Sequence, residues 1–147
     1  MKKRFKSIGL LLMVFMLLVS NFSFVYATDD EITPYWNNVN MHEFSFQVLS
    51  PGEAHISIYY VAKSGVFVQA KSTVKIQKKI LGLFWTTVDI GTTNNEWVEY
   101  CTDVEGDLYN YYPVDGTGTY RAVFKLEITG IDGSVDVLED TIEYKYS

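Results

Sequence analysis

Apolar and polar residues alternate along most of the chain after residue 42, and no stretch sustains the three- and four-residue spacing of an amphipathic helix. Turn-forming groups such as Ser50-Pro51-Gly52 interrupt the alternation repeatedly. The runs between them predict seven β-strands, over residues 43–48, 54–60, 66–78, 84–90, 96–102, 119–128 and 135–146. Strands of this number and spacing favour an all-β fold built as a single antiparallel β-sandwich.

The last two predicted strands carry the strongest local signals. Gly130-Ile-Asp-Gly133 predicts a hairpin that joins them. In the final strand the apolar positions change parity between Val137 and Leu138. That change predicts a β-bulge, because one extra residue exchanges the two faces of a strand.

The start of the chain has the parts of a secretory signal peptide. Residues 1–6 are basic, residues 8–19 form an uncharged apolar run, and residues 25–27 place small side chains where signal peptidase reads them. The apolar run falls short of the roughly 20 residues that a membrane-spanning helix needs. No cysteine lies near the cleavage point to carry a lipid.

We therefore expect cleavage between Ala27 and Thr28 and release of a soluble protein, extracellular or associated with the cell wall. The membrane would be contacted only by the signal peptide during export. The chain then divides into the signal peptide 1–27, an N-terminal segment 28–42 and the sandwich domain 43–147.

Loss of the leader changes the charge, since it removes four basic residues and no acidic ones. The remainder has eight basic against 18 acidic residues, a net charge of −10. Such a chain should bind nucleic acid and anionic membranes poorly in a non-specific way. Residues 28–88 are balanced at five against five, whereas residues 89–147 have 13 acidic and three basic residues. One end or face should be markedly electronegative.

One local pattern points to a particular kind of sandwich. Gly118-Thr-Tyr120-Arg-Ala122, preceded by Asp115, resembles the Asp-x-Gly-x-Tyr-x-Cys stretch of immunoglobulin-like domains, in which the tyrosine hydroxyl pins the corner entering the sixth strand. Asp115 lies three residues before Gly118 instead of two, and Ala122 stands in the place of the cysteine. The resemblance implies an immunoglobulin-like sandwich without that disulfide. The single cysteine, Cys101, cannot close an internal bridge.

A second resemblance covers most of the chain beyond the leader. Ile76-Gln-Lys-Lys79, Trp85-Thr-Thr-Val88 and Gly118-Thr-Tyr-Arg121 are followed by an Asp-Gly hairpin near the C-terminus. This order is similar to that of an uncharacterised group of small secreted proteins of Gram-positive bacteria, a domain of unknown function. The resemblance implies an extracellular, immunoglobulin-like β-sandwich and no activity.

His55, Cys101 and Arg121 follow the chain order of the catalytic residues of sortase transpeptidases, where a base activates the thiol and an arginine steadies the oxyanion. The sequence Val98-Glu-Tyr-Cys101 departs from the Thr-Leu-x-Thr-Cys that sortases share, and the adjacent Glu99 would disfavour a thiolate if it lay close. A secreted thiol enzyme of transpeptidase type that uses Cys101 is therefore kept as an alternative. No other catalytic motif is present in the sequence.

Asp103, Glu105 and Asp107 alternate in what the sequence indicates is a loop. Alternate acidic side chains can turn their oxygens toward one calcium ion, although Gly106 does not stand where an EF-hand has its glycine. A calcium site and a solvated acidic loop both stay open. No other cofactor is expected.

Lys71, Lys75 and Lys79 share one face of the third predicted strand, and we call them the lysine stripe. The stripe could hold an anionic wall polymer through charge alone. It could equally protect an edge strand against pairing with another chain.

Tyr109, Tyr111 and Tyr112 stand in an expected loop before the sixth predicted strand. Exposed tyrosines could stack on sugar rings. Alternatively they anchor the loop to the core with wet hydroxyls.

These observations favour a secreted, non-catalytic binding or surface-associated module, whose ligand is a cell-wall polymer, a glycan or another extracellular protein, and not a nucleic acid. Besides the thiol enzyme, a secreted inhibitor or self-protection protein is a second alternative. It would present a loop to one protein target.

Overall fold

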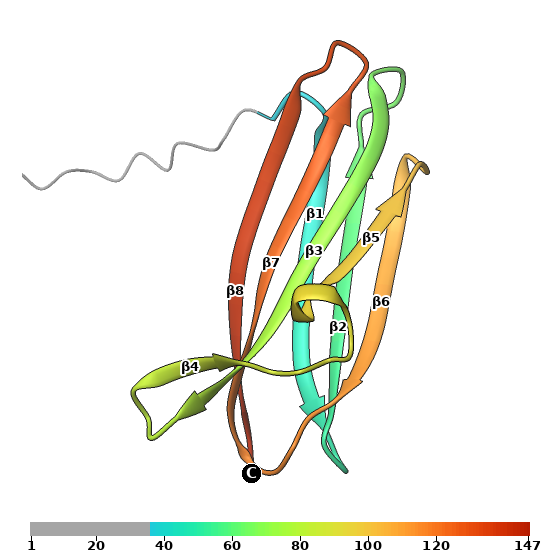
Figure 1. The fold of residues 1–147 in the computed structure, drawn as a ribbon. Coiled ribbons are helices and arrows are strands. Elements are labelled where there is room, and N and C mark those ends of the chain that lie inside the picture. Colours follow the sequence, from blue (N-terminus) through green and yellow to red (C-terminus); the bar gives the residue numbers. More distant parts are fainter. Residues whose placement is uncertain (1–35) are drawn as a thin grey trace, which may run out of the picture. The chain divides into compact units, whose positions relative to one another are not determined.

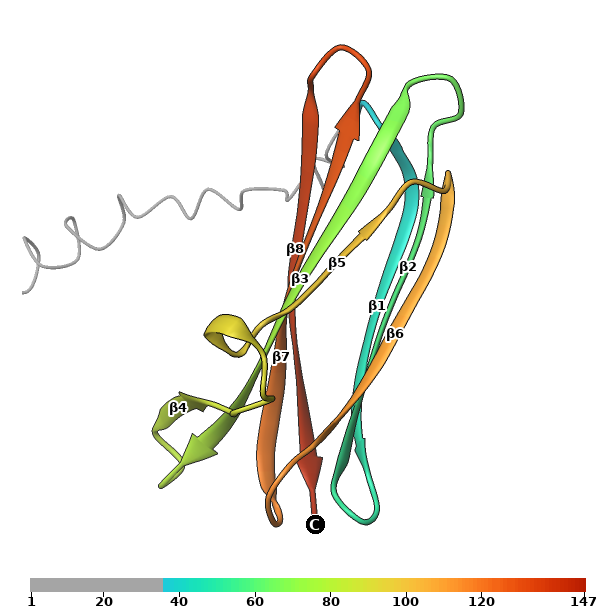
Figure 2. The same ribbon diagram turned by 45° about the vertical axis from the view of Figure 1, so that its right-hand side comes forward.

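The computed structural model describes residues 36–147, which form two antiparallel β-sheets packed face to face (Figures 1 and 2). The predicted signal peptide, its cleavage at Ala27 and Thr28, and residues 28–35 lie outside the described residues. The strands are β1 (Val39–Leu49), β2 (Glu53–Ala62), β3 (Phe67–Ile80), β4 (Phe84–Thr87), β5 (Trp97–Cys101), β6 (Glu105–Pro113), β7 (Gly118–Gly130) and β8 (Val135–Tyr146). A single 3-10 turn, η1 (Thr93–Asn95), precedes β5.

Sheet A has the order β1-β2-β6, and sheet B has the order β4-β3-β7-β8 with β5 also paired to β3. The all-β sandwich is therefore confirmed, with eight strands in place of about seven. The additional strand is β6, which covers residues that the sequence indicated as a loop. β1 starts at Val39, so residues 39–42 of the expected N-terminal segment already belong to sheet A.

The core lies between the sheets and is built from the alternating positions that the sequence placed inward. In β2 and β7 every second residue is buried: Ala54, Ile56, Ile58, Tyr60, Tyr120, Ala122, Phe124, Leu126 and Ile128. Phe44 of sheet A stacks on Phe124 of sheet B with ring centroids 5.0 Å apart. The described core residues all lie within residues 36–146. In the part of the chain that the structure describes, no helix is long and apolar enough to cross a membrane.

The β-bulge predicted in the final strand is wrong. β7 and β8 pair in continuous register from Gly118 and Tyr146 to Thr129 and Val135. The parity changes because Val135 and Val137 point outward and are exposed, while Asp136 points inward and is buried. A buried carboxylate in the core-facing row produced the same sequence pattern as an inserted residue.

The tyrosine corner expected from the sequence is present. The Tyr120 hydroxyl lies 2.6 Å from the Asp115 carbonyl oxygen and 2.7 Å from that of Gly116, so its one proton is shared between them. Asp115 therefore contributes its main chain, and the additional residue before Gly118 is accommodated. The bonds hold the β6–β7 connection against the start of β7.

Removal of this hydroxyl in Tyr120→Phe should lower the free energy of unfolding by about 1–2 kcal/mol, because the ring stays buried while the two carbonyls lose their donor. Urea denaturation measures the change. Tyr100→Phe is the matched control, since Tyr100 is 58% exposed and should have almost no effect. Equal effects of the two substitutions would contradict a structural role of the corner.

Candidate functional site

The outer face of sheet A collects most of the exposed aromatic and acidic side chains of its three strands. The register sets His55 opposite Tyr111, Ser57 opposite Tyr109 and Tyr59 opposite Asp107. β1 extends the same rows with Gln47, Ser45 and Glu43. We call this surface the tyrosine face; its outward residues are Glu43, Ser45, Gln47, Glu53, His55, Ser57, Tyr59, Glu105, Asp107, Tyr109 and Tyr111.

Tyr109 and Tyr111 form the exposed centre of the tyrosine face. They are two residues apart on β6, so both point away from the core, and they are 62% and 49% exposed. Their ring centroids are 5.9 Å apart with the planes inclined at 55°. Two large apolar surfaces are thus offered side by side to solvent.

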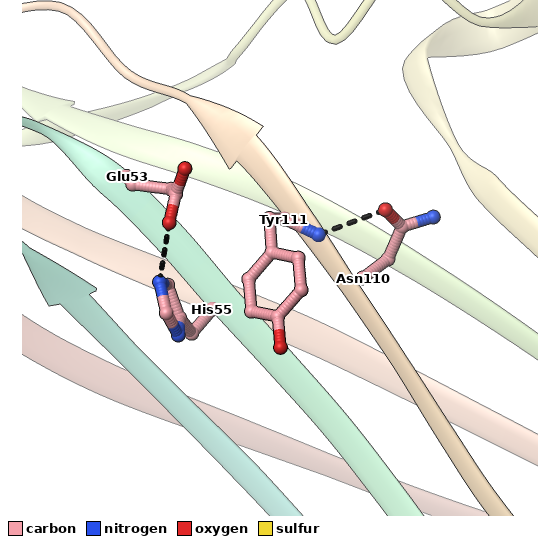
Figure 3. Close-up of polar contacts among 4 residues, drawn as sticks. All are labelled: Glu53, His55, Asn110 and Tyr111. Carbon is pink, nitrogen blue, oxygen red and sulfur yellow. Dashed lines mark hydrogen bonds and ion pairs between the residues drawn. The ribbon is translucent and has the colours of Figure 1, made fainter.

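His55 supports Tyr111 from β2 (Figure 3). Its ring meets the ring of Tyr111 edge-on, with centroids 4.4 Å apart, and its Nε2 lies 2.7 Å from Oε1 of Glu53. On the other side, the main-chain N–H of Tyr111 donates to the side-chain oxygen of Asn110 at 2.8 Å. The contact with the His55 ring restricts the position of the Tyr111 ring, which reduces the entropy lost when a ligand is bound.

Acidic groups lie on the same face of sheet A as the two rings. The Tyr59 hydroxyl donates to Oε1 of Glu105 at 2.7 Å, and this hydrogen bond raises the pKa of Tyr59. No lysine or arginine occurs anywhere in β1, β2 or β6, whereas β3, β7 and β8 together hold seven. The described charge is therefore divided by sheet, and the tyrosine face is acidic. Aromatic rings beside carboxylate, hydroxyl and amide groups can bind a hydroxyl-rich or cationic ligand, but they disfavour an anionic one.

The third predicted tyrosine lies elsewhere. Tyr112 points inward from β6, next to the core, and its hydroxyl accepts a hydrogen bond from Nδ2 of Asn110 at 3.1 Å. Burial, together with the charge of Glu99, raises the pKa of Tyr112. The prediction of a loop over Tyr109, Tyr111 and Tyr112 is wrong because the segment is a strand, and strand periodicity sends Tyr112 to the opposite side.

The acidic residues Asp103, Glu105 and Asp107 also do not form a loop, since Glu105 and Asp107 belong to β6. The Asp103 carbonyl oxygen accepts from the Tyr60 hydroxyl at 3.0 Å, and Glu105 accepts from Tyr59. Within residues 36–147 no group of three or more His, Cys, Asp or Glu side chains is placed to hold a metal ion. The calcium site stays a prediction, to which the structure adds no ligand cluster.

The lysine stripe lies on the outer face of sheet B. β3 pairs with β7 on one side and with β4 and β5 on the other, so it is an interior strand and the edge-protection interpretation is wrong. Lys71 lies 3.3 Å from Glu127, and Lys75 lies 2.9 Å from Glu96.

Glu127 neutralises part of the positive charge of the lysine stripe. Burial would raise the pKa of Glu127, but hydrogen bonds from Lys125 and Lys71 outweigh it and leave that pKa lowered. Much of the positive charge of the stripe is therefore already paired within the protein.

The three residues of the transpeptidase alternative are not brought together. Cys101 contacts the core from β5, whereas His55 lies on the outer face of sheet A. Arg121 lies on the outer face of sheet B, where its guanidinium is 4.2 Å from the ring of Trp85. The hydrogen-bond partners of the His55 and Arg121 side chains are Glu53 and Gln77, and neither of them is the thiol.

Sequence reasoning missed one conspicuous surface. Residues 81–83 were interpreted only as a turn and Phe84 as the start of a strand, yet Ile80, Leu81, Leu83 and Phe84 are all exposed at the tip of the β3–β4 hairpin. The available signal was composition, because turns normally carry Gly, Pro, Asn, Asp or Ser. Four large apolar residues at a turn are unusual.

No protein-family model matches the chain, and no curated protein matches it. Among solved structures, one that it resembles is described as a cohesin module from Clostridium perfringens ATCC13124 family 33 glycoside hydrolase. That match has a TM-score of 0.47 and 12% sequence identity, and it covers 74% of this chain and 97% of the module.

Proposed function

We propose that the protein is a secreted, non-catalytic binding module and that the tyrosine face binds its ligand. The observation that carries the proposal is the exposed pair Tyr109 and Tyr111, with His55 against the ring of Tyr111, on a sheet whose strands contain no lysine or arginine. Exposed aromatic residues with few rotatable bonds provide a large contact area at low entropic cost, which is a property of binding surfaces.

The charge of the tyrosine face limits the classes of ligand that it can bind. Glu43, Glu53, Glu105 and Asp107 would repel an anionic wall polymer, which makes teichoic acid a poor ligand for this surface. Carboxylates and hydroxyls are good partners for sugar hydroxyl groups, and the tyrosine rings can cover the apolar face of a sugar. The ligand class we propose is a neutral glycan of the extracellular space.

Replacement of both exposed tyrosines, in Tyr109→Ala with Tyr111→Ala, should weaken binding of a neutral polysaccharide by about tenfold or more, since each ring contributes roughly 0.5–1.5 kcal/mol. Affinity electrophoresis in gels containing soluble β-glucan, xylan or mannan measures the change.

The protein for this experiment is taken from culture medium. Mass spectrometry should show that its first residue is Thr28, as expected for cleavage of the signal peptide after Ala27.

Tyr100→Ala is the matched control, because Tyr100 is as exposed as Tyr109 but lies on β5 in sheet B. It should leave binding unchanged. Retention of binding in the Tyr109 and Tyr111 double variant, with loss in Lys71→Glu and Lys79→Glu, would assign the site to the lysine stripe and overturn the proposal. A single stoichiometric protein partner in place of any glycan would support the inhibitor alternative.

A further inference from the structure

The β3–β4 hairpin projects from the sandwich as an arm (Figures 1 and 2). Its apolar tip consists of Ile80, Leu81, Gly82, Leu83 and Phe84. Leu81 is 85% exposed and Phe84 is 65% exposed. Leu81 and Gly82 have positive φ values of 51° and 69°, and the Leu83 N–H donates to the Ile80 carbonyl oxygen at 3.0 Å. The turn is therefore well formed, and it presents the leucine and phenylalanine side chains to water.

Directly behind the tip, an aromatic ring lies against two cations. Trp85 pairs with Lys79 across the hairpin, and the Lys79 ammonium lies 5.1 Å from the centroid of its ring. The Arg121 guanidinium approaches the same ring at 4.2 Å while its Nε donates to Gln77. The ion pairs within residues 36–147 include neither Lys79 nor Arg121, although Glu143 is the register neighbour of Arg121 on β8.

We propose that this arm docks onto a lipid surface with anionic headgroups, which departs from the expectation that only the signal peptide contacts a membrane. Behind the apolar tip, Trp85 and Lys79 lie at one level of the hairpin and Arg121 lies against the same ring, an arrangement that fits the layers of a bilayer surface. Apolar side chains enter the boundary of the acyl chains, tryptophan favours the interface, and basic groups bind phosphate. Charge complementarity at Lys79 and Arg121 selects the anionic surface.

The negative net charge of the protein does not prevent such docking. Electrostatic repulsion between exposed groups decays over about 8–10 Å at physiological ionic strength, and the arm extends away from the acidic tyrosine face. Association of two arms with one another is less favourable, because it would bring two Lys79 and two Arg121 side chains together.

The test is co-sedimentation with vesicles of equal parts phosphatidylglycerol and phosphatidylcholine, using the chain from Thr28, which contains the whole described core. Leu81→Asp and Phe84→Asp should each reduce the partition coefficient by about tenfold or more, because each removes a large apolar contact and adds a negative charge. Added salt should weaken binding of the unsubstituted protein to the mixed vesicles, and Lys79→Glu should bind these vesicles more weakly than the unsubstituted protein. The unsubstituted protein should also bind pure phosphatidylcholine less well than the mixed vesicles.

Ile131→Asp is the matched control. Ile131 is 75% exposed at the tip of the β7–β8 hairpin, at the other end of the sandwich from the arm (Figure 1). This variant should bind the mixed vesicles as the unsubstituted protein does. Absence of vesicle binding, or equal loss in Ile131→Asp and Leu81→Asp, overturns the proposal. Binding that is indifferent to phosphatidylglycerol and to Lys79→Glu overturns the role of the cations. The glycan site is unaffected by any of these outcomes, since Tyr109 and Tyr111 lie on the other sheet.

Discussion

Replacement of Asp136 by alanine is expected to lower the free energy of unfolding by about 3–5 kcal/mol, a large part of the stability of a domain of this size. The carboxylate is only 7% exposed and accepts from three successive main-chain N–H groups, two just before β1 and one at its first residue. Asn37 donates at 3.1 Å, Asn38 at 2.6 Å and Val39 at 3.2 Å. One side chain of β8 thus fixes the start of β1 across the sandwich.

The expected loss of stability is large because the main-chain donors remain buried after the carboxylate is removed. With alanine at position 136, buried N–H groups lose their acceptor, and a buried unsatisfied donor costs about 1–3 kcal/mol. The buried side chain of Asn38 is held next to Asp136, since its Nδ2 donates to Oγ of Ser134 at 3.0 Å, two residues before Asp136 in the chain. Loss of Asp136 should therefore also loosen Asn38.

Urea denaturation followed by circular dichroism measures the effect. Glu139→Ala is the matched control, because Glu139 is an exposed carboxylate on the same strand, and it should change stability by less than about 0.5 kcal/mol. Asp136→Asn should fall between the two, since an amide keeps one acceptor oxygen. If Asp136→Ala is as stable as Glu139→Ala, the carboxylate does not join the two sheets.

Asp136 also shows where sequence reasoning reaches its limit. The alternation of apolar residues placed the cores of β2 and β7 correctly, because their inward positions hold apolar or small residues without exception. In β8 the inward row contains a buried acid, and Val135 and Val137 occupy the outer row. A pattern of hydrophobicity cannot identify a buried carboxylate whose partners are main-chain groups from a distant strand.

The candidate site was predictable only in part, and for a related reason. Tyr109 and Tyr111 could be selected from the sequence, but the face they share with His55 and Tyr59 depends on the pairing of β6 with β2. That pairing places Glu105 and Asp107, which come from the acidic residues 89–147, beside β1 and β2, which come from residues 28–88, where acidic and basic residues are equal in number. The expected electronegative surface therefore follows the sheets and not the order of residues along the chain.

Gly106 is one reason why the sequence did not predict β6, and a substitution at this position tests what the glycine does in the strand. Gly106 and its acidic neighbours read as a loop, yet in β6 Gly106 stands opposite Tyr60. A Cβ atom at Gly106 would lie 2.2 Å from a ring carbon of Tyr60, whose side chain is fully buried. Glycine inside a strand commonly marks such a close approach. Here it makes space for an aromatic ring of the core.

Gly106→Ala is expected to lower the free energy of unfolding by about 3 kcal/mol, at the upper end of the usual cost of overpacking, because the ring or the strand must move. Thermal denaturation measures the loss. The decisive measurement is the double variant with Tyr60→Leu, which removes the ring that the new methyl group meets. In that background Gly106→Ala should cost at least about 1 kcal/mol less than it does alone. Strictly additive effects would mean that Gly106 is required for its backbone and not for the space it leaves to Tyr60.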